Sequence, residues 1–123
     1  MKVRDSWYQP YTTLAFIWAI VILLMLWLPP SELAGHSVLP FNGADKFIHA
    51  FLFATLYFLC AKAYVEHDLN FSKVYLMTFV MIYSGFTELI QLLIVDRSFE
   101  FTDMMANAIG VVAAHVITNH LQN

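Results

Sequence analysis

The chain has 123 residues, a length that suits one domain. Hydrophobic residues make up 60% of it and charged residues 12%, whereas a soluble domain has roughly 45–50% and about 25%. The net charge of −3 offers no basic surface, which argues against a nucleic-acid partner. A single cysteine, Cys60, cannot form an intrachain disulfide and is expected to pack as a small apolar residue. The composition therefore indicates an integral membrane protein.

Four apolar segments divide the chain, over residues 12–28, 47–65, 74–95 and 104–121. Each holds about 17–22 residues, enough to cross a hydrocarbon core about 30 Å thick at 1.5 Å per residue. Backbone groups in lipid must be hydrogen-bonded within their own segment, so we predict four transmembrane helices. The first apolar run is longer than the core of a signal peptide, and no cleavage pattern follows it, so we predict an uncleaved helix.

The connections between these segments are short, which favours antiparallel neighbours. We therefore predict an all-α, up-down-up-down four-helix bundle that forms a single membrane domain over residues 1–123. Positive charges set the orientation, since cytoplasmic segments carry an excess of Lys and Arg. With the N-terminus inside, the inner segments hold Lys2, Arg4, Lys62 and Lys73, and the outer ones hold Lys46 and Arg97. Both termini are accordingly expected in the cytoplasm.

Polar residues interrupt the apolar pattern mainly near one membrane surface. His115 lies away from them, toward the inner half of the fourth segment, where core packing or pore lining are both open. The residues near that surface repeat at helical spacing within each segment: Asp45 with His49, Glu88 with Gln91, and Asp103 with Asn107 and Gly110. Residues three, four or seven apart share one face of a helix. In an up-down bundle, these three polar faces lie at the same depth. We therefore expect them to meet inside the bundle.

Glu88 is the least expected of these residues, because it lies about 10 Å into the third segment. A charged side chain at depth costs about 2.5–3.5 kcal/mol on insertion scales, and such a residue usually faces the bundle interior and has a partner. Lys46 and Arg97 are the candidate cations, and His49 is a candidate switch. A purely structural pair of Glu88 with Arg97 is the alternative.

The other polar residues also have structural interpretations. Asp45 and Asp103 stand at helix starts, where they could serve only as caps. Gln91 and Asn107 could be hydrogen-bonding contacts between helices. Arg97 could be a surface anchor that reaches the lipid head groups.

The ordered set of polar residues resembles the VanZ-like family, named for the teicoplanin-resistance protein. The matching stretches are "DKFIHAFLFATL", "GFTELIQLL" and "DRSFEFTDMMANAIG". The family pattern maps onto Asp45, Lys46, His49, Glu88, Gln91, Arg97, Ser98, Asp103, Asn107 and Gly110. The resemblance implies a small multi-pass protein of the bacterial cytoplasmic membrane that is linked to the cell envelope and, in one branch, to glycopeptide resistance. It implies no particular reaction.

The first functional hypothesis is a binding site for the head group of a membrane lipid or a lipid-linked envelope precursor. Arg97 and Lys46 would hold a phosphate, since Arg makes bidentate contacts and Lys provides a point charge. Glu88, Asp103 and His49 would contact an amine or a sugar hydroxyl. Asp45, Gln91, Ser98 and Asn107 complete the predicted set of ligand-binding residues.

The second hypothesis is an enzyme that modifies the same lipids. Glu88, His49 and Asp103 would be its catalytic acid–base residues. No G-x-S-x-G motif is present, and Ser98 is equally a loop residue or a nucleophile. A divalent metal held by Asp45, His49, Glu88 and Asp103 is conceivable, because these residue types bind metals. No H-E-x-x-H spacing occurs in the sequence, so we predict neither a metal nor a cofactor. A transport path is disfavoured because the inner half offers few polar residues.

Overall fold

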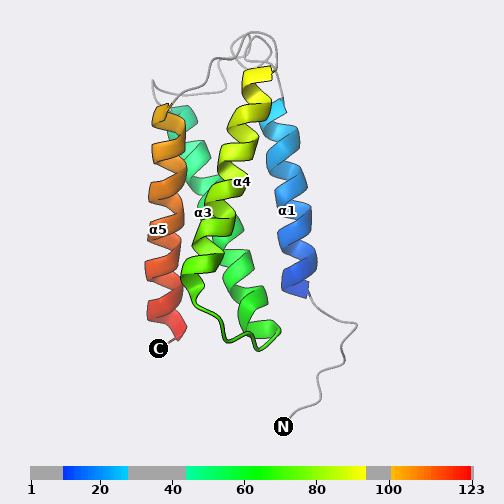
Figure 1. Ribbon diagram of the computed structural model, residues 1–123, viewed down its shortest axis with the longest axis vertical. Coiled ribbons are helices and arrows are strands. Elements are labelled where there is room, and N and C mark those ends of the chain that lie inside the picture. Colours follow the sequence, from blue (N-terminus) through cyan, green and yellow to red (C-terminus); the bar gives the residue numbers. More distant parts are fainter. Residues whose placement is uncertain (1–9, 28–43, 94–100, 123) are drawn as a thin grey trace.

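The computed structural model describes residues 10–27, 44–93 and 101–122, and all of its elements are helices. They are α1 (Pro10–Trp27), α3 (Ala44–Glu66), α4 (Lys73–Leu93) and α5 (Phe101–Gln122). Their directions alternate along the chain (Figure 1). The predicted all-α bundle is confirmed, and the helix bounds differ from the predicted spans by at most three residues.

The lengths and compositions of the helices suit a membrane. Within the described residues, α3, α4 and α5 are each long and apolar enough to cross a bilayer, and α1 is a shorter apolar helix. Large hydrophobic side chains such as Ile17, Phe47, Ile82 and Ile109 are exposed on the outer faces of the four helices. A soluble protein rarely exposes apolar surface so widely. These outer faces therefore fit contact with lipid.

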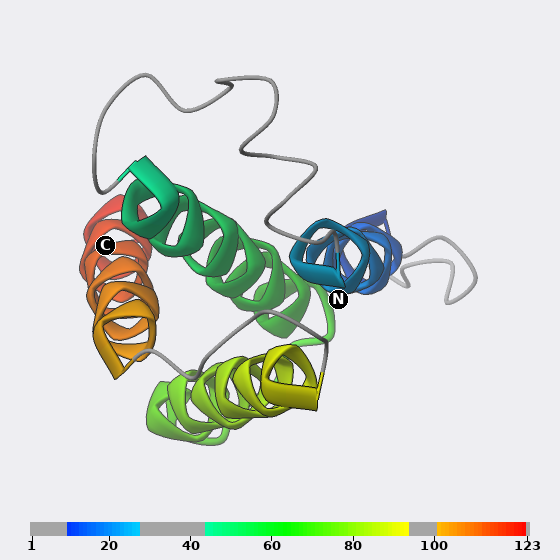
Figure 2. The ribbon, with the colours of Figure 1, turned by 90° about the horizontal axis from the view of Figure 1, so that it is seen from above.

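Helix α3 is central in the packing. It makes its most extensive contacts with α5 and its next most extensive with α1, and these two helices lie at opposite ends of α3 when the bundle is seen from above (Figure 2). Gly110 of α5 lies directly against the backbone of Ala50 of α3. Small residues allow helix backbones to approach closely in membranes. The four-residue spacing of Ala50 with Ala54 and of Gly110 with Ala114 in the sequence also indicates packing faces on these two helices.

Two side-chain hydrogen bonds to backbone carbonyl groups attach α1 to the bundle. The indole Nε1 of Trp18 donates to the carbonyl oxygen of Leu52 on α3 at 2.9 Å. The hydroxyl of Tyr83 on α4 donates to the carbonyl oxygen of Ala19 at 2.6 Å. Both acceptors are backbone carbonyl groups of helices, so the bonds fix the position of α1 without a charged residue.

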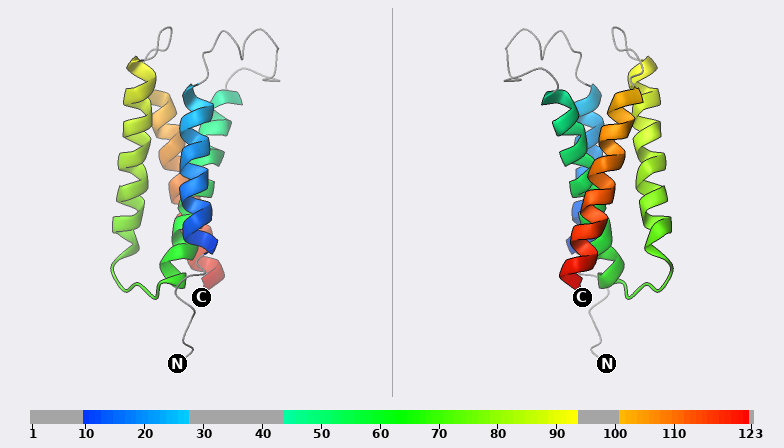
Figure 3. Two further views of the ribbon diagram at one scale, coloured as in Figure 1. Left: turned by 90° about the vertical axis from the view of Figure 1, so that its right-hand side faces the viewer. Right: turned by 90° about the vertical axis from the view of Figure 1, so that its left-hand side faces the viewer.

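The turn between α3 and α4 reverses the chain within a few residues. Asp68 has a φ of 52°, in the left-handed region, and its neighbour Leu69 donates a backbone hydrogen bond to the oxygen of Tyr64 at 3.1 Å. This pattern ends a helix by satisfying its last carbonyl groups. The hydroxyl of Ser72 then accepts from the backbone N–H of Val74 at 3.3 Å, beside the start of α4. The tight turn keeps α3 and α4 antiparallel (Figure 3).

The predicted orientation of the termini can be tested by cysteine labelling in intact cells. A cysteine placed at Ser98, which lies outside the described residues, should react with a membrane-impermeant thiol reagent. The native Cys60 should not react, because it lies toward the inner half of the second predicted span, within α3. Labelling of Ser98→Cys only after lysis would instead place both termini outside.

Candidate functional site

Three polar side chains from three helices meet inside the bundle. His49 of α3, Glu88 of α4 and Asp103 of α5 have exposed fractions of 2%, 1% and 5%. His49 Nδ1 lies 3.7 Å from Glu88 Oε1, and His49 Nε2 lies 3.8 Å from Asp103 Oδ2. Their positions near the start of α3, the end of α4 and the start of α5 place them at one end of the bundle (Figures 1 and 3). The imidazole therefore stands between two carboxylates.

Lys46 forms the outer edge of this group. Its Nζ donates to Asp103 Oδ1 at 3.2 Å, and its side chain is 37% exposed. Lys46 or Arg97 was the expected partner of Glu88. Among the described residues, His49 lies beside Glu88 and Lys46 beside Asp103, and the expected pairing with Arg97 lies outside the described residues. The reason is register: Lys46 is nearly one turn closer to the helix end than His49, level with the start of α5. We call His49, Glu88, Asp103 and Lys46 the polar cluster.

A layer of neutral polar groups lies one turn deeper. Asn107 Nδ2 donates to Ser84 Oγ at 2.7 Å, and Thr87 Oγ1 donates to the carbonyl oxygen of Ser84 at 2.7 Å. Gln91 is also buried on α4, but it lies three residues nearer the helix end than Glu88. Asn107 Oδ1 is buried and has no hydrogen-bond partner among the described residues. Ser84 and Thr87 were not predicted as site residues, although their spacing from Glu88 and Gln91 places them on the same helix face.

The contacts described above include none of three predicted site residues, which are Asp45, Arg97 and Ser98. Asp45 belongs to the first turn of α3, and its side chain is not described. Arg97 and Ser98 lie outside the described residues. Asp103 stands in the first turn of α5, as the capping interpretation requires. Its carboxylate nevertheless contacts Lys46 and lies near His49, so it also belongs to the polar cluster.

A second polar network occupies the opposite half of the bundle. Tyr57 Oη and His115 Nδ1 are hydrogen-bonded at 2.6 Å. Asn119 Nδ2 lies 3.1 Å from His115 Nε2, and Lys73 Nζ donates to Asn119 Oδ1 at 2.8 Å. This chain of contacts again joins α3, α4 and α5. Sequence analysis missed it, because His115 was considered alone rather than with Asn119, four residues later on the same face.

An apolar layer separates the two networks. Phe53, Val80 and Val111 are each fully buried. Each lies, along its own helix, between the residues of the polar cluster and those of the second network. The described polar side chains therefore do not form a continuous path through the bundle.

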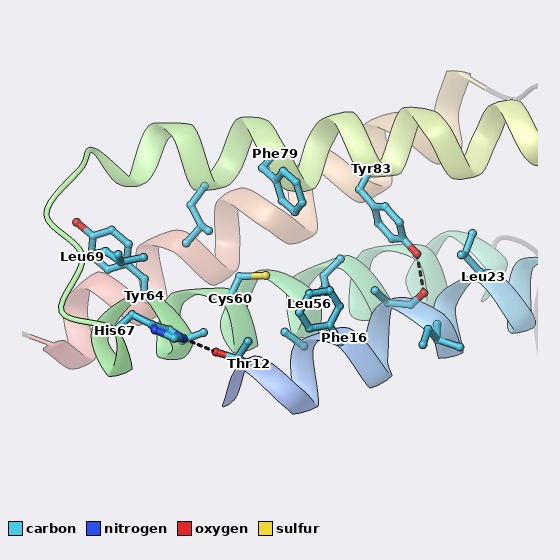
Figure 4. Close-up of a pocket in the computed structure, with 15 residues that line it drawn as sticks. Thr12, Phe16, Leu23, Leu56, Cys60, Tyr64, His67, Leu69, Phe79 and Tyr83 are labelled. Atoms are coloured by element: carbon cyan, nitrogen blue, oxygen red, sulfur yellow. Dashed lines mark hydrogen bonds between the residues drawn. The ribbon is translucent and has the colours of Figure 1, made fainter. Parts of the chain in front are cut away.

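A groove of about 480 Å³ lies between α1, α3 and α4 (Figure 4). Its lining is almost entirely apolar, with Phe16, Leu56 and Phe79 among its residues. A hydrogen bond of 2.7 Å between Thr12 and His67 lies at one end of it. The groove shares no residue with the polar cluster. Its chemistry suits hydrocarbon and not a polar head group.

Buried ionisable groups on helices with apolar outer faces define the class: a multi-pass helical membrane protein with a polar site inside its bundle. A family model described as VanZ/LLP1 matches residues 7–122, nearly the whole chain, and the protein belongs to this family. This confirms the resemblance noted in the sequence. Comparisons with curated proteins and with solved structures found no significant match.

Proposed function

We propose that this protein binds the polar head group of a membrane lipid or lipid-linked envelope precursor in its polar cluster. The observation that carries the proposal is the burial of His49, Glu88 and Asp103 together at one end of apolar helices. Ionisable residues are costly within a membrane, so such residues usually mark a ligand or ion site. The three residues come from three different helices, so the group forms only when the bundle is folded.

The chemistry of the cluster matches a zwitterionic or hydroxyl-bearing head group. The carboxylates of Glu88 and Asp103 accept hydrogen bonds from amines or sugar hydroxyls. Lys46 is the partly exposed cation at the edge, where it can reach a phosphate. Arg97, which lies outside the described residues, remains the second residue that we expect to bind the phosphate. In this proposal, any resistance to teicoplanin would follow from shielding of an envelope lipid.

The alternative is an enzyme that acts on such lipids, and one observation favours it. Each ring nitrogen of His49 faces a carboxylate oxygen, at 3.7 and 3.8 Å. A histidine oriented by one carboxylate and close to a second is a suitable proton donor or acceptor. Contacts longer than a hydrogen bond in a free site often shorten once substrate binds. Glu88, His49 and Asp103 would then be the catalytic residues.

Lipids that co-purify with the protein test the proposal. We expect one lipid class to be enriched with the wild-type protein and to be lost from Lys46→Gln, because this variant removes the cation at the edge of the cluster. Lys46 is partly exposed, so the variant should fold. Lys62→Gln is the matched control: it removes the same charge from the opposite end of α3, and it should retain the lipid.

Mass spectrometry of the detergent-purified proteins provides the measurement. Equal lipid content in wild type, Lys46→Gln and Lys62→Gln would refute binding at the cluster. Conversion of the enriched lipid to a product of different mass during incubation would favour the enzyme. His49→Gln should then abolish the conversion.

A further inference from the structure

We propose that His49, Glu88 and Asp103 together bind one divalent metal ion. This site goes beyond head-group binding and does not depend on it, since the three ligands all belong to the protein. Each residue offers one donor atom, and the three donors lie within 4.8 Å of one another. All three residues are buried, so an ion held there would be shielded from water.

The separation between His49 and Glu88 resembles that of two ligands in a coordination shell. His49 Nδ1 lies 3.7 Å from Glu88 Oε1, farther than a direct hydrogen bond, whereas the 3.8 Å contact with Asp103 is made by the other ring nitrogen, Nε2. Two ligands around a tetrahedral ion lie about 3.4 Å apart when each metal–ligand distance is about 2.1 Å. One nitrogen of the imidazole would bind the ion, and the other would keep its proton. Small side-chain rotations would then complete the coordination.

Charge also favours a cation at this position. Glu88 and Asp103 contribute two negative charges, against one positive charge from Lys46. With a neutral imidazole, these four side chains together carry a net negative charge, and the two carboxylates repel each other. A divalent ion removes this repulsion and makes the cluster positive. It would also allow the site to attract a phosphate.

A second feature near the cluster points to an additional ligand. Asn107 is fully buried one turn along α5 from Asp103. Its Oδ1 atom has no hydrogen-bond partner among the described residues, whereas most buried acceptors in proteins have one. A water molecule bound to the ion could donate to it. Three protein ligands plus water is the arrangement of a metal site with an open position.

The donor set indicates the kind of ion. Imidazole suits zinc and other first-row metals, and carboxylates suit manganese and magnesium. One imidazole with two carboxylates therefore favours Zn²⁺ or Mn²⁺. The ligands come from three different helices, so no short sequence motif connects them. This is why the H-E-x-x-H criterion gave no metal prediction.

Metal content of the purified full-length protein tests the site. After treatment with a chelator, the detergent-solubilised, delipidated protein should take up about one Zn²⁺ or Mn²⁺ per chain and unfold at a higher temperature. His49→Gln and Asp103→Asn should each bind the ion at least tenfold more weakly. His115→Gln is the matched control: it removes a histidine from the second network and should bind the ion like wild type.

Co²⁺ substitution gives a readout that a merely structural role would not change. Wild type and His115→Gln should show the intense visible absorption of a tetrahedral or five-coordinate Co²⁺ site, and His49→Gln should not. Uptake of no ion by the folded wild type would overturn the proposal and leave a protonated His49 as the counter-charge. Equal uptake by His49→Gln and Asp103→Asn would also overturn it. Because lipid is removed first, failure of head-group binding leaves these results unaffected.

Discussion

Gly110→Ala is expected to destabilise the bundle by about 1–3 kcal/mol, the usual cost of overpacking a close contact. A Cβ atom at Gly110 would overlap the carbonyl oxygen of Ala50 and lie 2.9 Å from its carbonyl carbon. Both are backbone atoms of α3, so no side-chain rotation relieves the contact. Helix α5 would have to move away from α3, its most extensive packing partner.

The same movement should weaken the polar cluster. Asp103 lies on α5, and its contacts with Lys46 and His49 cross the interface that the substitution would open. Loss of lipid or metal should therefore accompany the loss of stability. Ala50→Gly should not rescue Gly110→Ala, because the atoms in conflict are backbone atoms that glycine keeps.

Gly85→Ala is the matched control for this prediction. A Cβ atom there would meet only the Met104 Cε atom at 3.9 Å, an ordinary contact. Alanine is preferred to glycine within a helix by about 0.5–1 kcal/mol, so this variant should be unchanged or slightly more stable. Free energies of unfolding in mixed micelles provide the comparison. Equal free energies of unfolding for Gly110→Ala and Gly85→Ala would contradict the close packing of α3 against α5 at Gly110.

The architecture was predictable because the bilayer imposes a simple pattern. Apolar runs of sufficient length and short connections are visible in the sequence, and they led to four helices in alternating directions. The spacing of small residues on α3 and α5 indicated their packing faces, but it did not show that Gly110 contacts Ala50. The groove between α1, α3 and α4 was not predicted, because its presence depends on the distances between these helices.

The site was predictable in its members but not in its pairs. Helical spacing on α3, α4 and α5 identified His49, Glu88 and Asp103 as residues that meet. It could not assign Lys46 to Asp103 instead of Glu88, since that depends on the relative heights of three helices. The second network was missed for a related reason: Tyr57 and Lys73 belong to it only through contacts with α5. Neither residue is unusual at its position in the sequence.

The second large effect is expected at Glu88. Removal of one member of a buried, charge-compensated group typically costs about 3–5 kcal/mol, because the remaining charge loses its compensation without regaining water. Glu88 and His49 are both buried, so neither side chain can turn into water without opening the bundle. Lys46, the partner of Asp103, has a side chain that is 37% exposed and can regain water. We therefore expect Glu88→Gln to be more destabilising than Asp103→Asn.

A double-mutant cycle tests whether Glu88 acts through His49. Contacting residues show coupling energies of about 0.5–3 kcal/mol, and distant ones are additive. Glu88→Gln and His49→Gln should be coupled in this range, whereas Glu88→Gln and His115→Gln should be additive. Asp68→Asn is the control for the change of carboxylate to amide: Asp68 is exposed in a turn, and asparagine accepts its positive φ. It should leave stability unchanged. Additivity of Glu88→Gln with His49→Gln, at full lipid and metal binding, would mean that the two side chains share no site, and both the head-group and the metal proposals would fail with it.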